Sequence, residues 1–226
     1  MMDHSTPEAS ADPVAFVRAK TVLAPPSLLP ELRLHLATEV TPLWHATEAV
    51  LHASDLPPPY WAFAWPGGQA VARLVLDRPE LVRGRRVLDF AAGSGLAAVA
   101  CAKAGAARVV ANEIDRFASA AIRLNAAANG VDVEVLAEDV VGRPLPDFDL
   151  VLCGDVCYER PMADRVIPWL YALTAAGAEV LLGDPGRAYL PKDGLETLAE
   201  FVVPTSLDLE DRTQRSTRVY RIAAPG

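Results

Sequence analysis

The chain has 226 residues, of which 51% are apolar and 22% charged, a balance typical of one soluble globular domain. Its formal net charge of −8 argues against broad binding to nucleic-acid backbones, and no apolar run reaches the roughly 20 residues of a transmembrane helix. The polar, acidic start MMDHSTPEASAD resembles neither a signal peptide nor a transit peptide, so we expect a cytoplasmic protein. The three cysteines are Cys101, Cys153 and Cys157, and an odd number without a C-x-x-C pair predicts no disulfide framework and no zinc site.

Residues 1–60 are interpreted as an N-terminal extension, with 1–12 disordered or loosely attached. Asp12-Pro13 is a typical helix start, because the Asp can cap the helix and Pro fits its first turn. Short helices are expected around Leu28–Ala37 and Thr47–Ala53, separated by proline-rich extended segments. The extension has too few apolar residues in one pattern for a core of its own, so residues 61–226 should form the functional domain.

From Trp61 onward, apolar strands alternate with helical patterns. Strands are expected at Val87–Phe90, Arg108–Ala111, Val133–Ala137, Phe148–Gly154 and Glu179–Gly183. Helices are expected after Pro66 and at Gly95–Ala104, Arg116–Asn129, Met162–Ala175 and Gly194–Phe201. Val203–Leu209 and Thr217–Ile222 alternate and predict a closing antiparallel pair. This order predicts an α/β fold with a mostly parallel sheet, helices on both faces, and ligands bound beyond the carboxyl ends of the strands.

A glycine-containing loop, Asp89-Phe-Ala-Ala-Gly93-Ser-Gly95, follows the first of these strands and leads into a helix. Gly93 and Gly95 lack a Cβ, so the backbone can approach a ligand closely and turn sharply. Taken alone, the loop is explained equally well as a tight strand-to-helix connection.

Two more acids follow the next two strands. Glu113 lies 24 residues after Asp89 (113 minus 89), near the distance at which a carboxylate meets a ribose diol in dinucleotide folds. Asp139 can accept a hydrogen bond from an adenine amino group, with Val140 flanking the ring. Each acid can also be a solvated loop or turn residue.

The position of Asp89 indicates which nucleotide suits the loop. A carboxylate beside pyrophosphate is unfavourable, whereas one beside a cation is favourable. S-adenosylmethionine carries an ammonium and a sulfonium but no phosphate, so the acids favour it over a nicotinamide dinucleotide. A P-loop is excluded, because no G-K-[ST] occurs at the turn.

The run VLDFAAGSG at residues 87–95 resembles the first motif of the seven-stranded, Rossmann-like methyltransferases. The resemblance covers residues 61–222 and implies an S-adenosylmethionine-dependent methyltransferase domain over 61–226. It also implies that Glu113 binds the ribose and Asp139 the adenine. Ala91-Ala92 departs from the class, which often has Gly and a small residue there. We expect altered packing at Ala91 but retained binding.

A second cluster, Asp155-Val-Cys-Tyr158, follows the fourth strand. An Asp and a Tyr three residues apart on a turn can converge on an amine and orient its lone pair. A lysine must be neutral before it attacks a methyl group, and desolvation favours the neutral form. The alternative is a helix-capping Asp with a packing Tyr.

This D-x-x-Y resembles the signature of the lysine-modifying methyltransferase family 16. The runs YWAFAWPGGQ (residues 60–69) and GDPGR (183–187) resemble the electron transfer flavoprotein beta subunit lysine methyltransferases. The resemblance is strong over residues 60–190. It implies a bacterial cytoplasmic enzyme that methylates lysine on that flavoprotein subunit, with trimethyllysine as the furthest product.

These runs hold one candidate cofactor-binding residue, Trp65, and two candidate substrate-binding residues, Asp184 and Arg187. Trp65 and Arg187 each keep two interpretations. Trp65 is either a rim aromatic near the cofactor or a core residue. Arg187 either orients a substrate carboxylate or forms a structural link with Asp184.

Other functions remain open: a methyltransferase for a ribosomal protein or a small molecule, a non-catalytic adenosyl-ligand module, or a nicotinamide oxidoreductase. Asp155 and Tyr158 argue against a pure binding module, and Asp89 with the missing third glycine argues against the oxidoreductase. We expect a monomer that acts on a protein and binds neither nucleic acid nor membranes.

Overall fold

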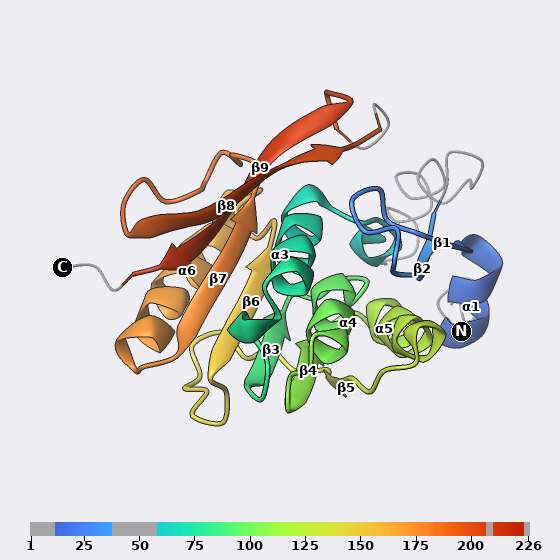
Figure 1. Ribbon diagram of the computed structural model, residues 1–226, viewed down its shortest axis with the longest axis horizontal. Coiled ribbons are helices and arrows are strands. Elements are labelled where there is room, and N and C mark those ends of the chain that lie inside the picture. The colour runs from blue at the N-terminus through green and yellow to red at the C-terminus, as the bar shows by residue number, and fades with distance from the viewer. Residues whose placement is uncertain (1–11, 38–57, 207–209, 224–226) are drawn as a thin grey trace, which may run out of the picture.

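The computed structural model describes residues 12–37, 58–206 and 210–223. It has a seven-stranded sheet in the order β5-β4-β3-β6-β7-β9-β8 and a two-stranded sheet of β1 and β2 (Figure 1). The strands are β1 (Val22–Ala24), β2 (Leu34–Leu36), β3 (Arg86–Phe90), β4 (Arg108–Asn112), β5 (Glu134–Leu136), β6 (Leu150–Gly154), β7 (Glu179–Asp184), β8 (Leu195–Pro204) and β9 (Gln214–Ile222). Strands β3 to β7 pair in parallel, while β9 runs antiparallel to both β7 and β8. The expected α/β fold and its mostly parallel sheet are confirmed.

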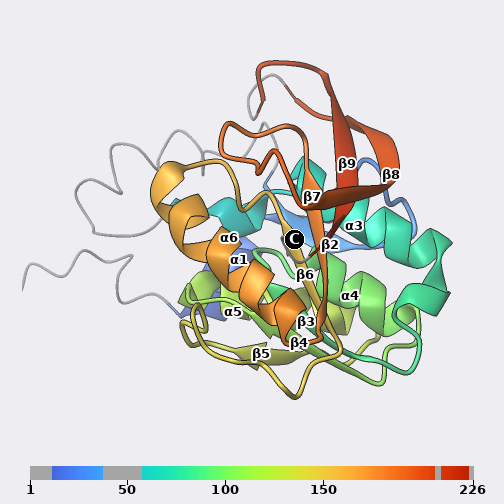
Figure 2. The ribbon, with the colours of Figure 1, turned by 90° about the vertical axis from the view of Figure 1, so that its left-hand side faces the viewer.

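Helices cover both faces of this sheet. The helices are α1 (Pro13–Lys20), α3 (Pro66–Asp77), α4 (Leu96–Lys103), α5 (Arg116–Asn129) and α6 (Arg160–Ala175), with short 3-10 turns η1 (Tyr60–Ala62) and η2 (Pro79–Leu81). Because successive side chains of a strand point to opposite faces, Val87 of β3 packs with α3 and α4, whereas Leu88 and Phe90 pack with α6. Figure 2 shows α6 on one side of the strands and α3 and α4 on the other.

The helix ends follow from local sequence. The Asp115 side chain caps α5 by accepting from the Phe117 amide at 2.8 Å, and Gly130 ends the helix with a positive φ of 65°. Asp12 caps α1 by accepting from the Val14 amide, as its sequence predicts.

Part of the N-terminal extension differs from the prediction. A helix over Leu28–Ala37 is wrong: this stretch forms turns followed by strand β2, which pairs with β1. The side chain of Asn125 in α5 accepts from the His35 amide at 2.7 Å, and Asn129 bonds both backbone polar groups of Arg33, so tertiary contacts replace helical bonds. The expected helix at Thr47–Ala53 and nearly all of the 1–12 segment lie outside the described residues.

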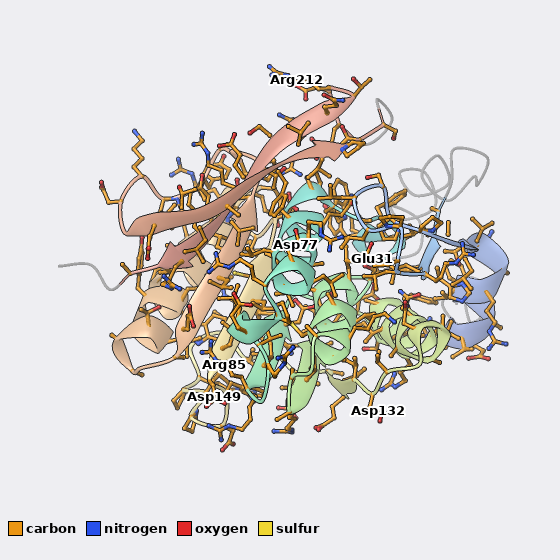
Figure 3. All side chains as sticks on the ribbon, viewed as in Figure 1. Glu31, Asp77, Arg85, Asp132, Asp149 and Arg212 are labelled. Carbon is orange, nitrogen blue, oxygen red and sulfur yellow. The ribbon has the colours of Figure 1, made fainter. Side chains whose placement is uncertain are left out.

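The extension also contributes to the main core. Leu29, Leu32 and Leu34 are fully buried within the cluster that α3 and α4 form. Arg73 of α3 pairs with Glu31 and Asp77, two acids that Figure 3 labels near the middle of the molecule. Residues 12–37 are therefore packed against the 61–226 region through both apolar and charged contacts.

The helix expected at Gly194–Phe201 is also wrong, because these residues belong to β8. The sequence LETLAEF has helix-forming residues, but β8 bonds to β9 along its length, with one irregularity between Thr197 and Ala199. Cross-strand pairing outweighs local helix propensity here. The antiparallel closing pair is confirmed, but it begins eight residues earlier than predicted (Leu195 against Val203).

Among the described residues, no helix has both the length and the apolar character that crossing a membrane requires.

Candidate active site

The N-terminus of α3 crosses directly over the ends of β6 and β7. A Cβ on Gly183 would lie closer than 3.0 Å to the Gly67 backbone, and a Cβ on Gly154 would meet the Gly68 backbone equally closely. Glycine at these positions lets helix and strands touch through their backbones. The crossing presses the first turn of α3 against Asp155, the residue that follows β6.

A cavity of about 700 Å³ opens beyond the carboxyl ends of β3, β4 and β6. Most of the site residues expected from the sequence line it: Trp65, Asp89, Gly93, Glu113, Asp139, Asp155, Tyr158 and Arg187. Three expected residues do not line it: Gly95, Val140 and Asp184. The position agrees with the general location of ligand sites in such sheets.

One buried and one half-buried carboxylate, Asp89 and Glu113, lie at one end of the cavity without a basic partner. Asp89 Oδ2 accepts from the Ala98 amide at 2.9 Å, and Glu113 Oε2 accepts from the Gly93 amide at 3.0 Å. Among the described residues, neither acid forms an ion pair. Burial raises the pKa of Asp89 to about 7, with a further rise from the Glu113 charge, and burial also raises the pKa of Glu113. Such an uncompensated pair of acids is suited to a cationic ligand.

The glycine loop keeps its left-handed turns despite the alanine. Gly93 and Gly95 have φ values of 53° and 74°, and Ala91 itself adopts a φ of 51°. A residue with a side chain is strained in this conformation. Ala91 therefore strains the loop locally but does not alter the course of its backbone. Gly95 does not line the cavity; it begins α4 with its Cα against Ile122, which lies about 3.0 Å from where a Cβ would be.

The third acid is exposed and paired. Asp139 accepts from Arg165 of α6 at 2.8 Å and from the Val141 amide at 3.0 Å, and this pairing lowers its pKa. Val141 lines the cavity, whereas the Val140 side chain is 2% exposed and packs in the core with α6. The residue that can flank a bound ring is therefore Val141, one position after the expected one.

Asp155 lies at the other end of the cavity, where backbone and side-chain donors hold it. Its Oδ2 accepts from the Gly67 amide at the start of α3, and its Oδ1 accepts from Arg187 Nε at 3.0 Å and Nη2 at 2.7 Å. Burial raises the pKa of Asp155 to about 6, and the Arg187 charge limits this rise. The residue has a positive φ of 56°, an unfavourable backbone conformation that recurs at functional sites. The bonds from Arg187 favour the ionised form, so Asp155 is a carboxylate held in one orientation.

Three aromatic rings border this end of the cavity. Tyr60 lies 5.6 Å from Tyr158 and 6.1 Å from Trp65, measured between ring centroids. Trp65 Nε1 donates to the Tyr60 carbonyl at 2.9 Å, so Trp65 is a rim residue that lines the cavity rather than a core residue. Burial raises the pKa of Tyr158, which keeps its hydroxyl protonated.

The Asp184 carboxylate and the Arg187 guanidinium bond different partners. Asp184 Oδ1 accepts from the backbone amides of Gly186 and Arg187 at 2.7 and 2.6 Å, so Asp184 shapes the turn after β7. The Arg187 guanidinium instead bonds Asp155 and Glu210. Among the described residues, no group of three or more potential metal ligands occurs.

Sequence reasoning missed several residues of this site. Tyr60, which lines the cavity, and Gly67, which donates to Asp155, belong to the run YWAFAWPGGQ. The sequence alone indicated no role for either residue. No local sequence pattern indicated Glu210, because its partner Arg187 lies 23 residues away in sequence (210 minus 187). Local glycine spacing could have indicated Gly67, whereas only the fold brings Glu210 to the site.

Comparisons with known proteins agree with this architecture. The family model of ribosomal protein L11 methyltransferase (PrmA) matches residues 74–156. The crystal structure of magnesium protoporphyrin IX methyltransferase (ChlM) from Synechocystis PCC 6803 with bound SAM superimposes with a TM-score of 0.51 at 21% identity, covering 69% of this chain and 79% of that one. The fold is that of the Rossmann-like, seven-stranded methyltransferases.

Sequence relatives define the family more narrowly. The chain is 40% identical over 205 residues to the Xenopus laevis electron transfer flavoprotein beta subunit lysine methyltransferase, covering 88% of this chain and 82% of the relative. The human protein of the same name is 37% identical over 206 residues, covering 90% and 77%. The chain belongs to the family of electron transfer flavoprotein beta subunit lysine methyltransferases.

Proposed function

We propose that this protein is an S-adenosylmethionine-dependent lysine N-methyltransferase that acts on the beta subunit of electron transfer flavoprotein. The observation that carries the proposal is one cavity with two chemically different ends. Two acids without a basic partner, the buried Asp89 and the half-buried Glu113, lie at one end, and the fixed carboxylate of Asp155 lies at the other. Membership of the family supports the substrate.

The acidic end of the cavity fits S-adenosylmethionine. Asp89 Oδ1 accepts no hydrogen bond from the described residues, so it remains available to a cationic group. Glu113 accepts from the amides of Gly93, Ile114 and Asp115, which leaves about one lone pair, on Oε2, for a ribose hydroxyl. Asp139 and Val141 lie where an adenine can be bonded and flanked. When bound, the cofactor supplies an electrophilic methyl group, and the protein supplies its position and surroundings.

The other end fits a lysine amine. Asp155 Oδ2 keeps a free lone pair beside its bond from Gly67, and can accept a proton of the incoming amine. The hydroxyl of Tyr158 and the faces of Tyr60 and Trp65 can enclose the aliphatic side chain and exclude water. Alignment and desolvation of a neutral amine would then supply most of the rate enhancement.

The proposed function is tested with a labelled methyl donor and a whole cell lysate. Wild-type protein should label a band that mass spectrometry identifies as the flavoprotein beta subunit, with the label on lysine. The Asp155→Asn protein should label that band at least about a hundredfold less in the same time. A labelled small molecule, or no label at all, would rule the proposal out.

Ribosomal protein L11 is the second candidate substrate, favoured by the family model that matches residues 74–156. That match ends at the D-x-x-Y turn and omits the YWAFAWPGGQ run and Arg187, which form the acceptor end. The match therefore supports a similar cofactor-binding region in the two kinds of protein more than it supports a common substrate. Purified L11 in the same labelling assay should remain unlabelled.

Replacing Glu113 by alanine should weaken cofactor binding by about tenfold to a hundredfold, because a charge-assisted bond to the ribose diol is lost. Calorimetric titration with S-adenosylhomocysteine measures this effect, and circular dichroism checks the fold. An unchanged affinity would remove Glu113 from the ribose site.

Cofactor affinity should rise with pH between about pH 5.5 and 7.5, by roughly tenfold. Asp89 is neutral below its pKa of about 7 and ionised above it, and the ionised form is the one that attracts a cation. At the lower pH, binding should therefore release a proton. Calorimetry in buffers of different ionisation enthalpy measures both quantities, and a flat affinity without proton release would show that Asp89 does not face the cationic group.

We also propose that the protein is a monomer of a bacterial cytoplasm with no affinity for nucleic acid or membranes. The acidic balance of the sequence supports the absence of nucleic-acid binding. Light scattering of the purified protein measures its mass in solution, and a dimer would contradict this proposal.

A further inference from the structure

Glu210 is a buried acid that the reaction scheme above does not use. Its side chain is 3% exposed and lies between two arginines. Its Oε1 accepts from Arg187 Nη2 at 2.6 Å, and its Oε2 accepts from Arg187 Nη1 at 3.2 Å and from Arg215 Nε at 3.0 Å. The residue comes shortly before β9, at the hairpin that β8 and β9 form at the edge of the sheet (Figure 1).

The same guanidinium reaches the acceptor end of the cavity. Arg187 Nη2 donates both to Glu210 Oε1 and to Asp155 Oδ1, at 2.6 and 2.7 Å. Glu210 does not line the large cavity, whereas Arg187 and Asp155 do. Any effect of Glu210 on a bound amine must therefore pass through Arg187.

Arg187 is fixed by bonds on both edges of its planar group. One edge faces Asp155 through Nε and Nη2, and the other faces Glu210 through Nη1 and Nη2. A planar guanidinium bonded on two edges cannot swing without breaking several charge-assisted bonds. Asp155 in turn has its other oxygen bonded to the Gly67 amide. Hydrogen bonds therefore connect Glu210 of the hairpin through Arg187 and Asp155 to the first turn of α3 without a gap.

We propose that Glu210 is a positioning residue of the acceptor site: it holds Arg187 so that Asp155 keeps the orientation that receives the lysine amine. The proposal rests on the proposed methyl transfer to lysine. It makes the β8–β9 hairpin, which contains none of the motifs recognised in the sequence, a part of the reaction machinery.

The isosteric change Glu210→Gln tests this role. It removes the charge and one of the acceptors between the two arginines, so Arg187 can shift relative to Asp155. We expect kcat for the flavoprotein subunit to fall about tenfold, because small losses of alignment are costly. The KM for S-adenosylmethionine should stay unchanged, since Glu210 is remote from the acidic end of the cavity.

A matched control lies on the same hairpin. Glu200 of β8 is exposed and pairs with Arg218 and Ser216, outside the cavity and outside the Arg187 network. Glu200→Gln should leave kcat and both KM values at the wild-type level. Both variants are compared per folded molecule, with the folded fraction taken from the stoichiometry of cofactor binding.

The pH profile separates positioning from mere stabilisation of the hairpin. The charged groups that face Asp155 are Arg187 and Asp184. Protonation of Asp155 should make log kcat fall at acid pH, which defines an acidic break in the profile. With the Glu210 charge removed, Arg187 pairs with Asp155 alone and favours its ionised form more, so this break should move to lower pH. A lower melting temperature with unchanged kcat and an unchanged break would overturn the proposal.

A second variant covers the case in which Glu210→Gln does not fold. Glu210→Asp keeps the charge but withdraws the carboxylate by one methylene, and should lower kcat while leaving the acidic break in place. Wild-type kcat in this variant would overturn the positioning role. Absence of transfer by the wild-type protein would instead contradict the lysine methyltransferase function itself.

Discussion

Gly183→Ala is expected to destabilise the protein by about 3 to 5 kcal/mol, because the added methyl forces apart two backbones in contact. The new Cβ would lie closer than 3.0 Å to the Gly67 carbonyl and to the Val71 side chain. Neither the strand nor the first turn of α3 can move without breaking the sheet or the bond from Gly67 to Asp155. Urea unfolding followed by circular dichroism measures the loss.

Gly68→Ala is the matched control, because it lies in the same turn but has open space where the Cβ would be. Alanine is the better helix former, so this change should stabilise the protein by about 0.5 to 1 kcal/mol. Equal stability of the two variants would contradict the close backbone contact between Gly67 of α3 and Gly183 of β7.

The second large effect is expected from Asp155→Asn. This change keeps the side-chain shape and suits the positive φ of 56°, but it removes the charge that Arg187 and an incoming amine share. Methyl transfer should fall at least about a hundredfold, the usual scale for a group that positions and deprotonates a nucleophile. Calorimetry should find cofactor affinity nearly intact, since the acidic end of the cavity is untouched.

The outcome for cofactor affinity decides where Asp155 belongs. If affinity falls as much as transfer does, Asp155 acts on the cofactor and not on the amine. If transfer continues at the wild-type rate, the acceptor site lies elsewhere in the cavity. A Tyr158→Phe variant in the same assay isolates the contribution of the neighbouring hydroxyl.

The alternation of strands and helices in the sequence was sufficient to predict the parallel sheet and the edge at which ligands bind. Glu113 and Asp155 directly follow β4 and β6, and Asp89 is the penultimate residue of β3, so parallel pairing alone brings all three to one edge. Gly67 of WPGGQ and Gly183 of GDPGR meet in one backbone crossing, so these two runs, far apart in sequence, serve the same contact.

What the sequence did not predict depends on contacts between distant segments. The β8 residues have helical propensity and become a strand only because β9 pairs with them. Val140 and Val141 are both apolar, and only the packing of α6 decides which one faces the cavity. Glu210 reaches Arg187 through the hairpin, a contact that no local pattern indicates.

The most direct test of the central claim uses purified electron transfer flavoprotein beta subunit, S-adenosylmethionine and this protein, followed by peptide mass spectrometry. Wild-type protein should add one, two or three methyl groups to lysine side chains, and Asp155→Asn should add at least about a hundredfold less in the same time. An unmodified subunit under conditions in which the cofactor is bound to the wild-type protein, or a methyl group on a residue other than lysine, would contradict this claim.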